Sequence, residues 1–342
     1  MDWGLGHASR CIPIIDELLR LEQRVLLAAS GRALHLWKRE YPNLPLFPLA
    51  EHNIRYFSSN MGLNIAMQWP KIIRAIWKDR KLIADIVAAQ KIDVIISDNR
   101  FGCYHASVHS IFMTHQLHLN VPKIVQWMNP LINHALIYQF DECWIPDVER
   151  EPSLAGKLSH PVLQLPTNYL GILSKMKKEV QAKKYDFLIL LSGPEPQRTK
   201  LEKKLIDQIH LLKGKILIVQ GLAEKEKYQK LSNQIEMVSF LKGKDLARAM
   251  QASEYIICRS GYSTVMDLIA IEKTALFIPT PGQTEQEYLA QQLQASGHFA
   301  TQKQKDLNLR EIEQVFPKKV DFSHLKKTNQ LKLVIKQLLL RI

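Results

Sequence analysis

Short runs of Val, Ile and Leu alternate along the whole chain with longer stretches in which apolar residues recur every three or four positions. The runs predict strands, and the longer stretches predict amphipathic helices. We expect strands at 24–30, 44–50, 92–98, 110–116 and 142–147, and again at 186–193, 215–221, 235–241, 255–261 and 275–281. Strands that are apolar throughout are typical of parallel sheets covered by helices on both faces. The pattern therefore predicts an α/β protein with doubly wound parallel sheets.

The chain of 342 residues is long enough for two domains, each with its own core. Between the two groups of strands lies a lysine-rich segment, SKMKKEVQAKK, which is typical of a connection between domains. We expect a Rossmann-like N-terminal domain at 1–161, a linker at 162–184, a second Rossmann-like domain at 185–323 and a C-terminal helix at 324–342. Ligands of such sheets bind at the carboxyl ends of the strands, so candidate residues are sought there.

Composition narrows the class of protein. No run approaches the ~18 apolar residues that cross a membrane, and no secretory signal is present. The cysteines are scattered, which argues against a disulfide framework or zinc site and favours the cytoplasm: Cys11, Cys103, Cys143 and Cys258. A net charge of +13 indicates an anionic partner. The basic residues are spread out without an aromatic platform, so we expect no nucleic-acid partner; the oligomeric state is not predicted.

The strand expected at 255–261 ends in Ser260 and Gly261 and leads directly into a helix. Free N–H groups at such a helix start bind phosphate, and glycine lets a ligand approach the backbone closely. Asp267 follows one turn later, at capping-box distance from Thr264. Its spacing is compatible both with a cap and with a carboxylate that accepts hydrogen bonds from ribose hydroxyls.

Two more strand ends carry polar loops. The strand at 275–281 leads into PTPGQTEQEY, where Thr284 and Glu287 fit a second capping box and place Glu285 and Gln286 in the first helical turn. The strand at 186–193 ends in a Ser-Gly-Pro turn. Each loop alone is weak evidence, but three in this order form a more specific pattern.

Together these loops resemble the donor domain of GT-B glycosyltransferases, especially the family of the peptidoglycan N-acetylglucosaminyltransferase that forms lipid II (glycosyltransferase family 28). The resemblance is carried by Arg-Ser-Gly at 259–261, the acid at 267, and a proline at 279 followed by a glutamine at 286, and it is closest over 185–300. It implies that a UDP-sugar donor is bound by Ser192, Gly193, Phe240, Leu241, Arg259, Ser260, Gly261, Asp267, Glu285 and Gln286. Three positions depart from the family: Asp267 replaces a glutamate, Glu287 replaces a glutamine, and LSGPEP replaces a glycine-rich phosphate loop.

The first half begins with DWGLGHASR, which fits the glycine-rich loop and first helix of a GT-B N-terminal domain. The central strand that precedes this loop is missing, so we expect Met1 to be an internal methionine with roughly seven apolar residues upstream. His7 is our first choice of catalytic base because histidine titrates near neutral pH, and Asp98 is the second. The acceptor side is expected at Gly6, Arg10, Asn99 and Arg100.

The resemblance implies an inverting, metal-independent transfer of a hexose or N-acetylhexosamine to a cell-envelope or lipid-linked acceptor, with no cofactor. It also implies that the C-terminal helix packs back on the first domain. Residues 68–81 combine apolar and basic positions, which is typical either of a helix lying on an anionic membrane, on the inner face of the plasma membrane, or of a packed helix with a solvated face.

Three alternatives remain open at this level. A GT-B-fold UDP-sugar 2-epimerase would bind the same donor, but Asp98 and Glu195 are its only obvious acids. A nicotinamide-dependent oxidoreductase would use GLGHAS as its fingerprint, although Ser9 stands where the fingerprint has a third glycine or an alanine. A non-enzymatic RNA-binding protein would account for the positive charge alone.

Overall fold

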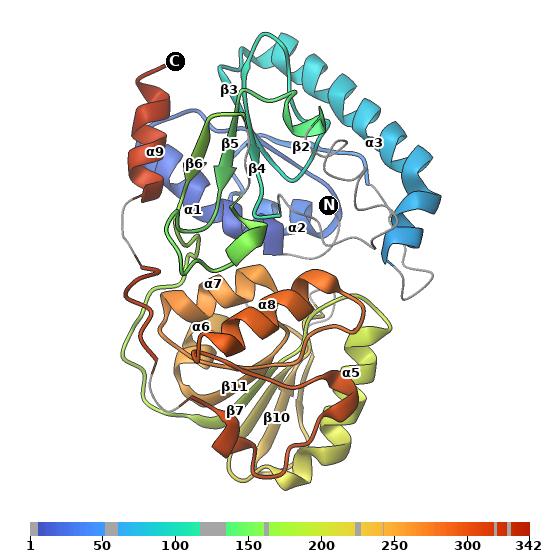
Figure 1. Cartoon of the computed structure of the whole chain (residues 1–342), viewed down its shortest axis with the longest axis vertical. Coiled ribbons are helices and arrows are strands. Elements are labelled where there is room, and N and C mark those ends of the chain that lie inside the picture. Colours follow the sequence, from blue (N-terminus) through green and yellow to red (C-terminus); the bar gives the residue numbers. More distant parts are fainter. Residues whose placement is uncertain are drawn as a thin grey trace. The chain divides into compact units, whose positions relative to one another are not determined.

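The computed structural model describes residues 6–51, 61–116, 135–160, 164–222, 227–241, 243–317, 320–326 and 330–342. The chain divides into two compact units: unit 1 is Met1–Leu173 with Lys327–Ile342, and unit 2 is Ser174–Lys326. Each unit combines parallel strands with covering helices (Figure 1). The predicted class, two Rossmann-like α/β domains, is therefore confirmed.

The described residues of unit 1 form two separate sheets. β1 (Leu27–Ala29) pairs with β2 (Leu46–Pro48), while β3 (Val94–Asp98), β4 (His109–Met113), β5 (Glu142–Ile145) and β6 (Thr167–Tyr169) form the other, in that order and all parallel. The helices are α1 (Gly6–Arg20), α2 (Gly31–Glu40), α3 (Met61–Gln90) and α9 (Gln330–Leu339), with a 3₁₀ turn at Gly156–Leu158. Among the described helices none is long and apolar enough to cross a membrane.

One helix packs against both sheets of unit 1. Ile83 and Ile86 of α3 lie in a single apolar cluster with Ile95 of β3, and Ala28 of β1 packs against the same cluster. Because Ala28 and Ile95 contact the same helix, the two sheets lie in one layer beneath α3.

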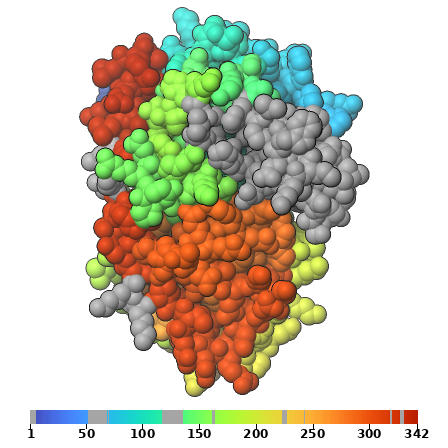
Figure 2. Space-filling view, in the orientation of Figure 1, coloured from blue at the N-terminus to red at the C-terminus, as the bar shows by residue number. Residues whose placement is uncertain are grey.

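The end of the chain returns to unit 1. α9 contacts α1 and β6 and buries Val334, Ile335 and Leu338. Figure 2 shows this helix in red on the surface beside the yellow-green β6 segment. The stretch taken from the sequence as a linker contains β6, and the boundary between the units falls after Leu173.

Unit 2 is built on one sheet with the order β13-β12-β11-β7-β8-β10-β9. Only β9 (Tyr228–Lys230), on the edge, runs antiparallel; the others are β7 (Tyr185–Leu190), β8 (Ile216–Val219), β10 (Ile235–Val238), β11 (Ser253–Cys258), β12 (Leu276–Phe277) and β13 (Ala300–Thr301). The helices are α5 (Gln197–Gln208), α6 (Gly243–Gln251), α7 (Tyr262–Ala270) and α8 (Thr284–Ala295), with 3₁₀ turns at Ile209–Leu211, Gln304–Asp306 and Ile312–Val315. Phe187, Ile189 and Ile257 anchor the core on one face of the sheet.

Strand order locates the point where ligands bind in unit 2. After β7 the chain moves through β8 and β10 towards one edge, and it then returns to β11 on the other side of β7. In doubly wound sheets ligands bind at the carboxyl ends of the strands where the order reverses. In unit 2 that point lies between β7 and β11.

Candidate active site

Two glycine-containing loops meet at the switch point of unit 2. Leu190 and Cys258, the last residues of β7 and β11, are direct partners in the sheet. The loop at Ser192–Gly193 follows the first strand, and the loop at Ser260–Gly261 follows the second. Two segments that are far apart in the sequence therefore begin side by side.

Glycine stands at positions 193 and 261 for different structural reasons. Gly193 has φ of +104°, a conformation that other residues rarely adopt. Gly261 is the N-cap of α7 with an ordinary φ of −73°, and a Cβ there would meet only Thr264 Oγ1, at 3.8 Å. The fold itself thus does not require glycine at 261. Because glycine has no side chain, however, it leaves the first N–H groups of α7 accessible to a ligand. The positive end of the helix dipole favours an anion at this position.

Asp267 does not cap α7, so the predicted capping box with Thr264 is wrong. Because α7 begins at Tyr262, Asp267 lies in the second turn, and its Oδ1 accepts a hydrogen bond of 2.5 Å from Ser174 Oγ. Burial raises the pKa of Asp267 to about 6, against the opposing effects of the Ser174 hydrogen bond and of Lys175. The carboxyl group is consequently poised to change its charge just below neutral pH.

The second predicted capping box, at the start of α8, is also wrong. The N-cap is Gln283 rather than Thr284, and Glu287 Oε1 instead accepts a hydrogen bond of 3.1 Å from the N–H of Gly282. Glu285 remains in the first turn, half-buried. The acid at 287 therefore holds the loop before the helix rather than the helix end.

Arg259 and Gln286 tie the loops of unit 2 together. Arg259 is 1% exposed and donates hydrogen bonds to the carbonyls of Ile278 and Pro279 at 2.8 and 3.0 Å, and to that of Gln197. Gln286 Oε1 accepts a hydrogen bond of 2.9 Å from Thr280 N, and the Gln286 carbonyl accepts one of 2.8 Å from Ser260 Oγ. These side chains position the loops after β7, β11 and β12.

The remaining donor-side candidates follow the strands β7 and β10 of unit 2. Ser192 is half-buried, and Phe240 and Leu241 are half-buried residues between β10 and α6. Glu195, the acid considered for an epimerase, is bound by Arg198 Nε at 2.7 Å and by the N–H of Thr199.

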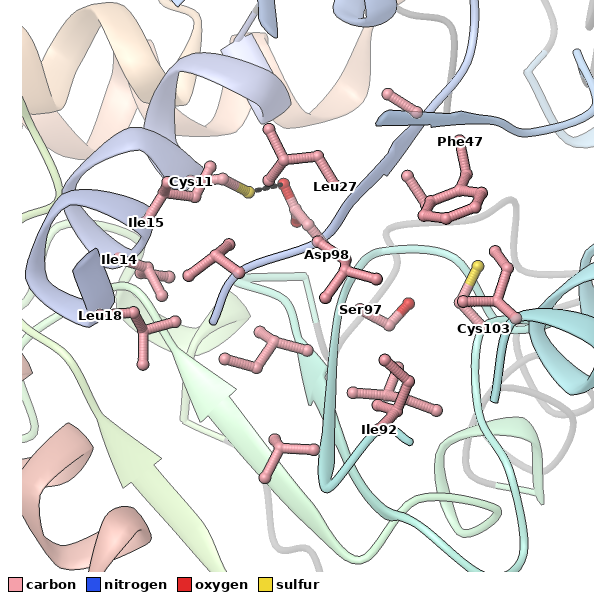
Figure 3. Close-up of a pocket in the computed structure, with 18 of the residues that line it drawn as sticks. Cys11, Ile14, Ile15, Leu18, Leu27, Phe47, Ile92, Ser97, Asp98 and Cys103 are labelled. Atoms are coloured by element: carbon pink, nitrogen blue, oxygen red, sulfur yellow. Dashed lines mark hydrogen bonds between the residues drawn. The ribbon is translucent and has the colours of Figure 1, made fainter. Parts of the chain in front are cut away.

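A second group of polar side chains lies in unit 1, where β3 ends and α1 begins. Asp98 Oδ2 is 3.2 Å from His7 Nδ1 and 3.0 Å from Arg10 Nε, and Arg10 Nη2 donates to the other carboxylate oxygen. Arg10 Nη1 also donates to His115 Nδ1 at 2.8 Å. Figure 3 shows Asp98 at the end of its strand, close to Cys11 of α1. We call His7, Arg10, Asp98 and His115 the histidine–arginine cluster.

Charges in the histidine–arginine cluster favour a neutral His7. Burial and the nearby Arg10 cation lower the pKa of His7, while Asp98 acts in the opposite direction. Although burial alone would raise the pKa of Asp98, Arg10 and His7 hold it well below its usual range. Asp98 is therefore a fixed anion and a poor base. His7 Nδ1 lies 3.2 Å from Asp98 Oδ2 and 2.9 Å from Arg10 Nη2, which can only donate. In the tautomer with its proton on Nδ1, His7 donates to Asp98 and presents the lone pair of Nε2 as a proton acceptor; in the other tautomer Nδ1 accepts from Arg10.

The other acceptor-side candidates serve the backbone of unit 1. Gly6 is the first residue of α1, and its carbonyl accepts a hydrogen bond from Ser9 Oγ. Asn99 adopts φ of +57°, which asparagine tolerates better than most residues, and its N–H continues the pairing of β3 with β4. Arg100 donates two hydrogen bonds of 3.0 Å to Asp79 and one of 2.9 Å to Ser30 Oγ. Its guanidinium is 9% exposed, so its role here is to hold α3 and β1 to the end of β3.

From the sequence, His115 at the end of the strand at 110–116 is either an acceptor-side contact or a loop histidine with satisfied hydrogen bonds, and the second interpretation is favoured; Ser174 is not selected. His115 follows β4, the parallel neighbour of β3, so its closeness to Asp98 could have been inferred from strand adjacency. Ser174 has no such signal, because it reaches Asp267 from a segment 93 residues earlier.

Comparison with known proteins agrees with this geometry. Residues 194–338 match the glycosyltransferase family 28 C-terminal domain. The UDP-N-acetylglucosamine–N-acetylmuramyl-(pentapeptide) pyrophosphoryl-undecaprenol N-acetylglucosamine transferase of Wigglesworthia glossinidia brevipalpis is 22% identical, over 83% of this chain and 77% of its own. The enzyme of the same name from Caldanaerobacter subterraneus is 21% identical, over 90% of this chain and 86% of its own. The crystal structure of Acinetobacter baumannii MurG superposes with a TM-score of 0.56, 14% identity, and coverage of 97% of this chain and 95% of that one.

The family match covers the Ser260–Gly261 loop and begins directly after Gly193, and the relatives extend over both units. The fold similarity likewise spans nearly the whole chain. We conclude that the chain is a nucleotide-sugar-dependent glycosyltransferase with the GT-B fold, and that its residues 194–338 are similar to the glycosyltransferase family 28 C-terminal domain.

Proposed function

We propose that the protein transfers a hexose or N-acetylhexosamine from a UDP-sugar to a lipid-linked acceptor of the cell envelope. The observation that carries this proposal is the N-terminus of α7 at Gly261, which has no side chain, next to the loop of Gly193 at the switch point of unit 2; α7 lies within the residues that match family 28. The printed names of the sequence relatives, which use UDP-N-acetylglucosamine and an undecaprenol-linked acceptor, support the substrate classes.

In this proposal unit 2 binds the donor. The N–H groups at the start of α7 and in the Gly193 loop bind the diphosphate, and Asp267 accepts hydrogen bonds from ribose hydroxyls. The backbone at Phe240 and Leu241 contacts the base. Glu285 and Gln286 lie on the first turn of α8, where their side chains are available to sugar hydroxyls.

The chemistry then needs one base and one stabilised leaving group. His7 removes the proton of the acceptor hydroxyl through Nε2, and Asp98 holds the ring and stabilises the imidazolium that forms. The acceptor oxygen bonds to the anomeric carbon as the bond to the diphosphate breaks, so the configuration at that carbon inverts. Backbone N–H groups at α7 offset the charge on the departing diphosphate, a task that other enzymes assign to a metal ion.

The donor site is tested by titrating UDP into the protein and into Asp267→Ala. Loss of hydrogen bonds to a charged group costs about 1.5–3 kcal/mol, so we expect the Kd to rise about 10- to 100-fold. The carboxylate accepts ribose hydrogen bonds only when ionised, and its pKa is about 6. UDP affinity is therefore fully present above pH 6 and weakens as the pH falls through that value. Isothermal titration calorimetry at several pH values measures both effects.

Asp267→Asn is the matched variant, because it keeps the size of the side chain and cannot ionise. In this variant we expect the part of the pH dependence that Asp267 causes to disappear, leaving only that of the terminal phosphate of UDP, whose own second pKa is about 6. ADP, GDP and dTDP are titrated in parallel. Preference for one of them retains the fold and the enzyme class but changes the donor, whereas unchanged UDP binding in Asp267→Ala contradicts the role given to this carboxyl group.

Helix α3 supports the membrane side of the proposal. Trp77 is 67% exposed and Ile73 is 38% exposed, and at a spacing of four residues they share one face of the helix. Basic side chains lie exposed around this pair: Lys71, Arg74, Lys78 and Lys81. An apolar pair within a basic surface is typical of a helix that lies on anionic lipid.

Removing the apolar pair is expected to weaken binding to anionic vesicles. We predict that Ile73→Ser with Trp77→Ser lowers the fraction of protein that co-sediments with phosphatidylglycerol vesicles several-fold, while UDP binding by unit 2 is unchanged. Leu333→Ser, an exposed apolar residue of α9, is the control. Equal co-sedimentation of both variants and the parent protein would show that this face of α3 is only a solvated surface.

A further inference from the structure

Thr280, in the loop after β12, has a buried hydroxyl group that the fold does not use. The residue is 3% exposed, and its Oγ1 has no hydrogen-bond partner among the described residues. Buried polar side chains are nearly always hydrogen-bonded, because removing such a group from water without a new partner is unfavourable. A bound ligand or an ordered water molecule is therefore needed to account for this hydroxyl.

The backbone of Thr280 is held in place on both sides. Its N–H donates a hydrogen bond of 2.9 Å to Gln286 Oε1, and its carbonyl accepts one of 3.0 Å from the N–H of Gln283. The carbonyl of the preceding Pro279 accepts a hydrogen bond of 3.0 Å from the buried Arg259. Because threonine is β-branched, its side chain also has few rotamers available. The position of the hydroxyl is thus largely fixed before a ligand binds.

This hydroxyl lies beside the glycine loop that follows β7. A Cβ atom added to Gly193 would be 3.6 Å from Thr280 Oγ1. In the sheet β11 lies between β12 and β7, so the loops after the two outer strands meet over the end of β11, where Ser260–Gly261 leads into α7. Gln286 joins the same region, since its carbonyl accepts from Ser260 Oγ and its side chain from Thr280 N. Thr280 Oγ1 is therefore placed next to the N-terminus of α7.

The loop after β7 has fewer backbone donors than its glycine suggests. Pro194 and Pro196 have no N–H group, and the N–H of Leu191 is paired with the Val219 carbonyl at 2.8 Å. A diphosphate carries several oxygens that accept hydrogen bonds, and ionised phosphate oxygens are strong acceptors. A hydroxyl beside Gly193 would supply a donor that this proline-containing loop lacks.

We infer that Thr280 is a further donor-binding residue, whose hydroxyl donates a hydrogen bond to the diphosphate of the nucleotide bound at the start of α7. This inference rests on the proposed function and adds to it a side chain that the sequence motifs did not select. The hydroxyl is already buried in the free protein. Its removal from water is therefore a cost of folding rather than of binding, and the nucleotide gains the full hydrogen bond.

Thr280→Val tests the inference, because it removes the hydroxyl and keeps the shape of the side chain. We expect the Kd for UDP to rise about 10- to 100-fold, as for the loss of a hydrogen bond to a charged group. The midpoint of thermal unfolding without ligand should stay the same or rise, since no unpartnered hydroxyl remains buried. Thr280→Ser retains the hydroxyl and should bind UDP nearly as tightly as the parent protein. A residue that only supports the loop would not combine weaker binding with undiminished stability.

Thr274→Val is the matched control, because its hydroxyl has a partner within the protein. Thr274 Oγ1 donates a hydrogen bond of 2.6 Å to the His298 carbonyl, and the residue precedes β12 whereas Thr280 follows it. Here we expect the midpoint of thermal unfolding to fall by about 2–4 °C, with no change in the Kd for UDP. The two variants should thus change affinity and stability in opposite combinations.

Calorimetric titration of UDP, ADP and GDP into the parent and the variants separates this inference from the proposed function. If the parent prefers ADP or GDP and Thr280→Val weakens that nucleotide, the proposed donor is wrong but the role of Thr280 holds. If Thr280→Val binds UDP as tightly as the parent, the inference is overturned while the donor stands, and the hydroxyl holds only water. A lower unfolding midpoint of Thr280→Val would also overturn it, because the loss would then be structural. A parent protein that binds none of the three nucleotides contradicts both.

Discussion

Replacing His7 by glutamine is expected to lower kcat about 10²- to 10⁴-fold, with little change in UDP affinity. The reason is the geometry of the histidine–arginine cluster: Asp98 lies 3.2 Å from Nδ1, and when the ring donates its Nδ1 proton to Asp98, Nε2 carries the lone pair for the acceptor proton. Glutamine keeps a polar side chain of similar length but cannot take up a proton. UDP release from UDP-N-acetylglucosamine and other UDP-hexoses in the presence of a lipid-linked acceptor measures the rate.

The pH profile separates this role from a structural one. A base acts when it is unprotonated, and burial together with Arg10 lowers the pKa of His7 below 6.5. With saturating donor, kcat should stay constant from neutral pH to below 6.5 and then fall. Asp267→Asn should reduce the pH dependence of UDP binding near 6 to that of UDP's own terminal phosphate and leave this acid limb of kcat in place. A His7→Gln enzyme that retains more than a tenth of kcat, or the same acid limb, would rule out His7 as the base.

Replacing Arg100 by methionine is expected to lower the free energy of unfolding by about 3–5 kcal/mol. The substitution leaves Asp79, which is 0% exposed, as a buried carboxylate without its cation. It also removes hydrogen bonds to Ser30 Oγ at 2.9 Å and to the Ala50 carbonyl at 2.6 Å. Urea denaturation, followed by exchange or by fluorescence of unit 1, measures the change.

Arg248→Met is the matched control, because Arg248 and its partner Asp245 are both exposed on α6 and lie 3.9 Å apart. Exposed pairs contribute less than about 1 kcal/mol, so the urea midpoint should hardly move. Arg100→Met combined with Asp79→Leu should recover part of the loss, since both buried charges are then gone. If Arg100→Met instead keeps its stability and weakens acceptor use, the acceptor-side role expected from the sequence is correct.

Most of the strands were predictable because the sheets are parallel. A strand buried on both faces is a continuous apolar run, and all ten such runs contain strands, for example β8 within 215–221. β6, β9 and β13 were missed because their sequences, TNY, YQK and AT, include polar residues and form no apolar run. β12 is equally short, but it lies within an apolar run. β6 consequently lay hidden in the stretch assigned to the linker.

The candidate site was less predictable than the fold, because spacing does not specify where a helix starts. Thr264 and Thr284 have capping-box spacing, yet each lies inside the helix or at its first residue, with Gly261 and Gln283 at the caps. Strand adjacency correctly placed Asp98 near α1, but it could not show that Arg10 would neutralise this carboxylate. Arg100 shows a second limit of the sequence: a polar residue at a strand end can bind other parts of the protein, as Arg100 binds Asp79 and Ser30, instead of a ligand.

The return of α9 to unit 1 has a consequence for synthesis. Residues 330–339 leave the ribosome after the whole of unit 2, yet they pack against α1, which is made before unit 2, and line part of the apolar interior of unit 1 with Leu338. Unit 2 is complete by residue 326 and has all of its sheet strands before then. Domains generally fold as units during translation, with the N-terminal one first. Here the order is reversed. Unit 2 can fold completely while unit 1 still exposes the apolar surface that α9 later covers.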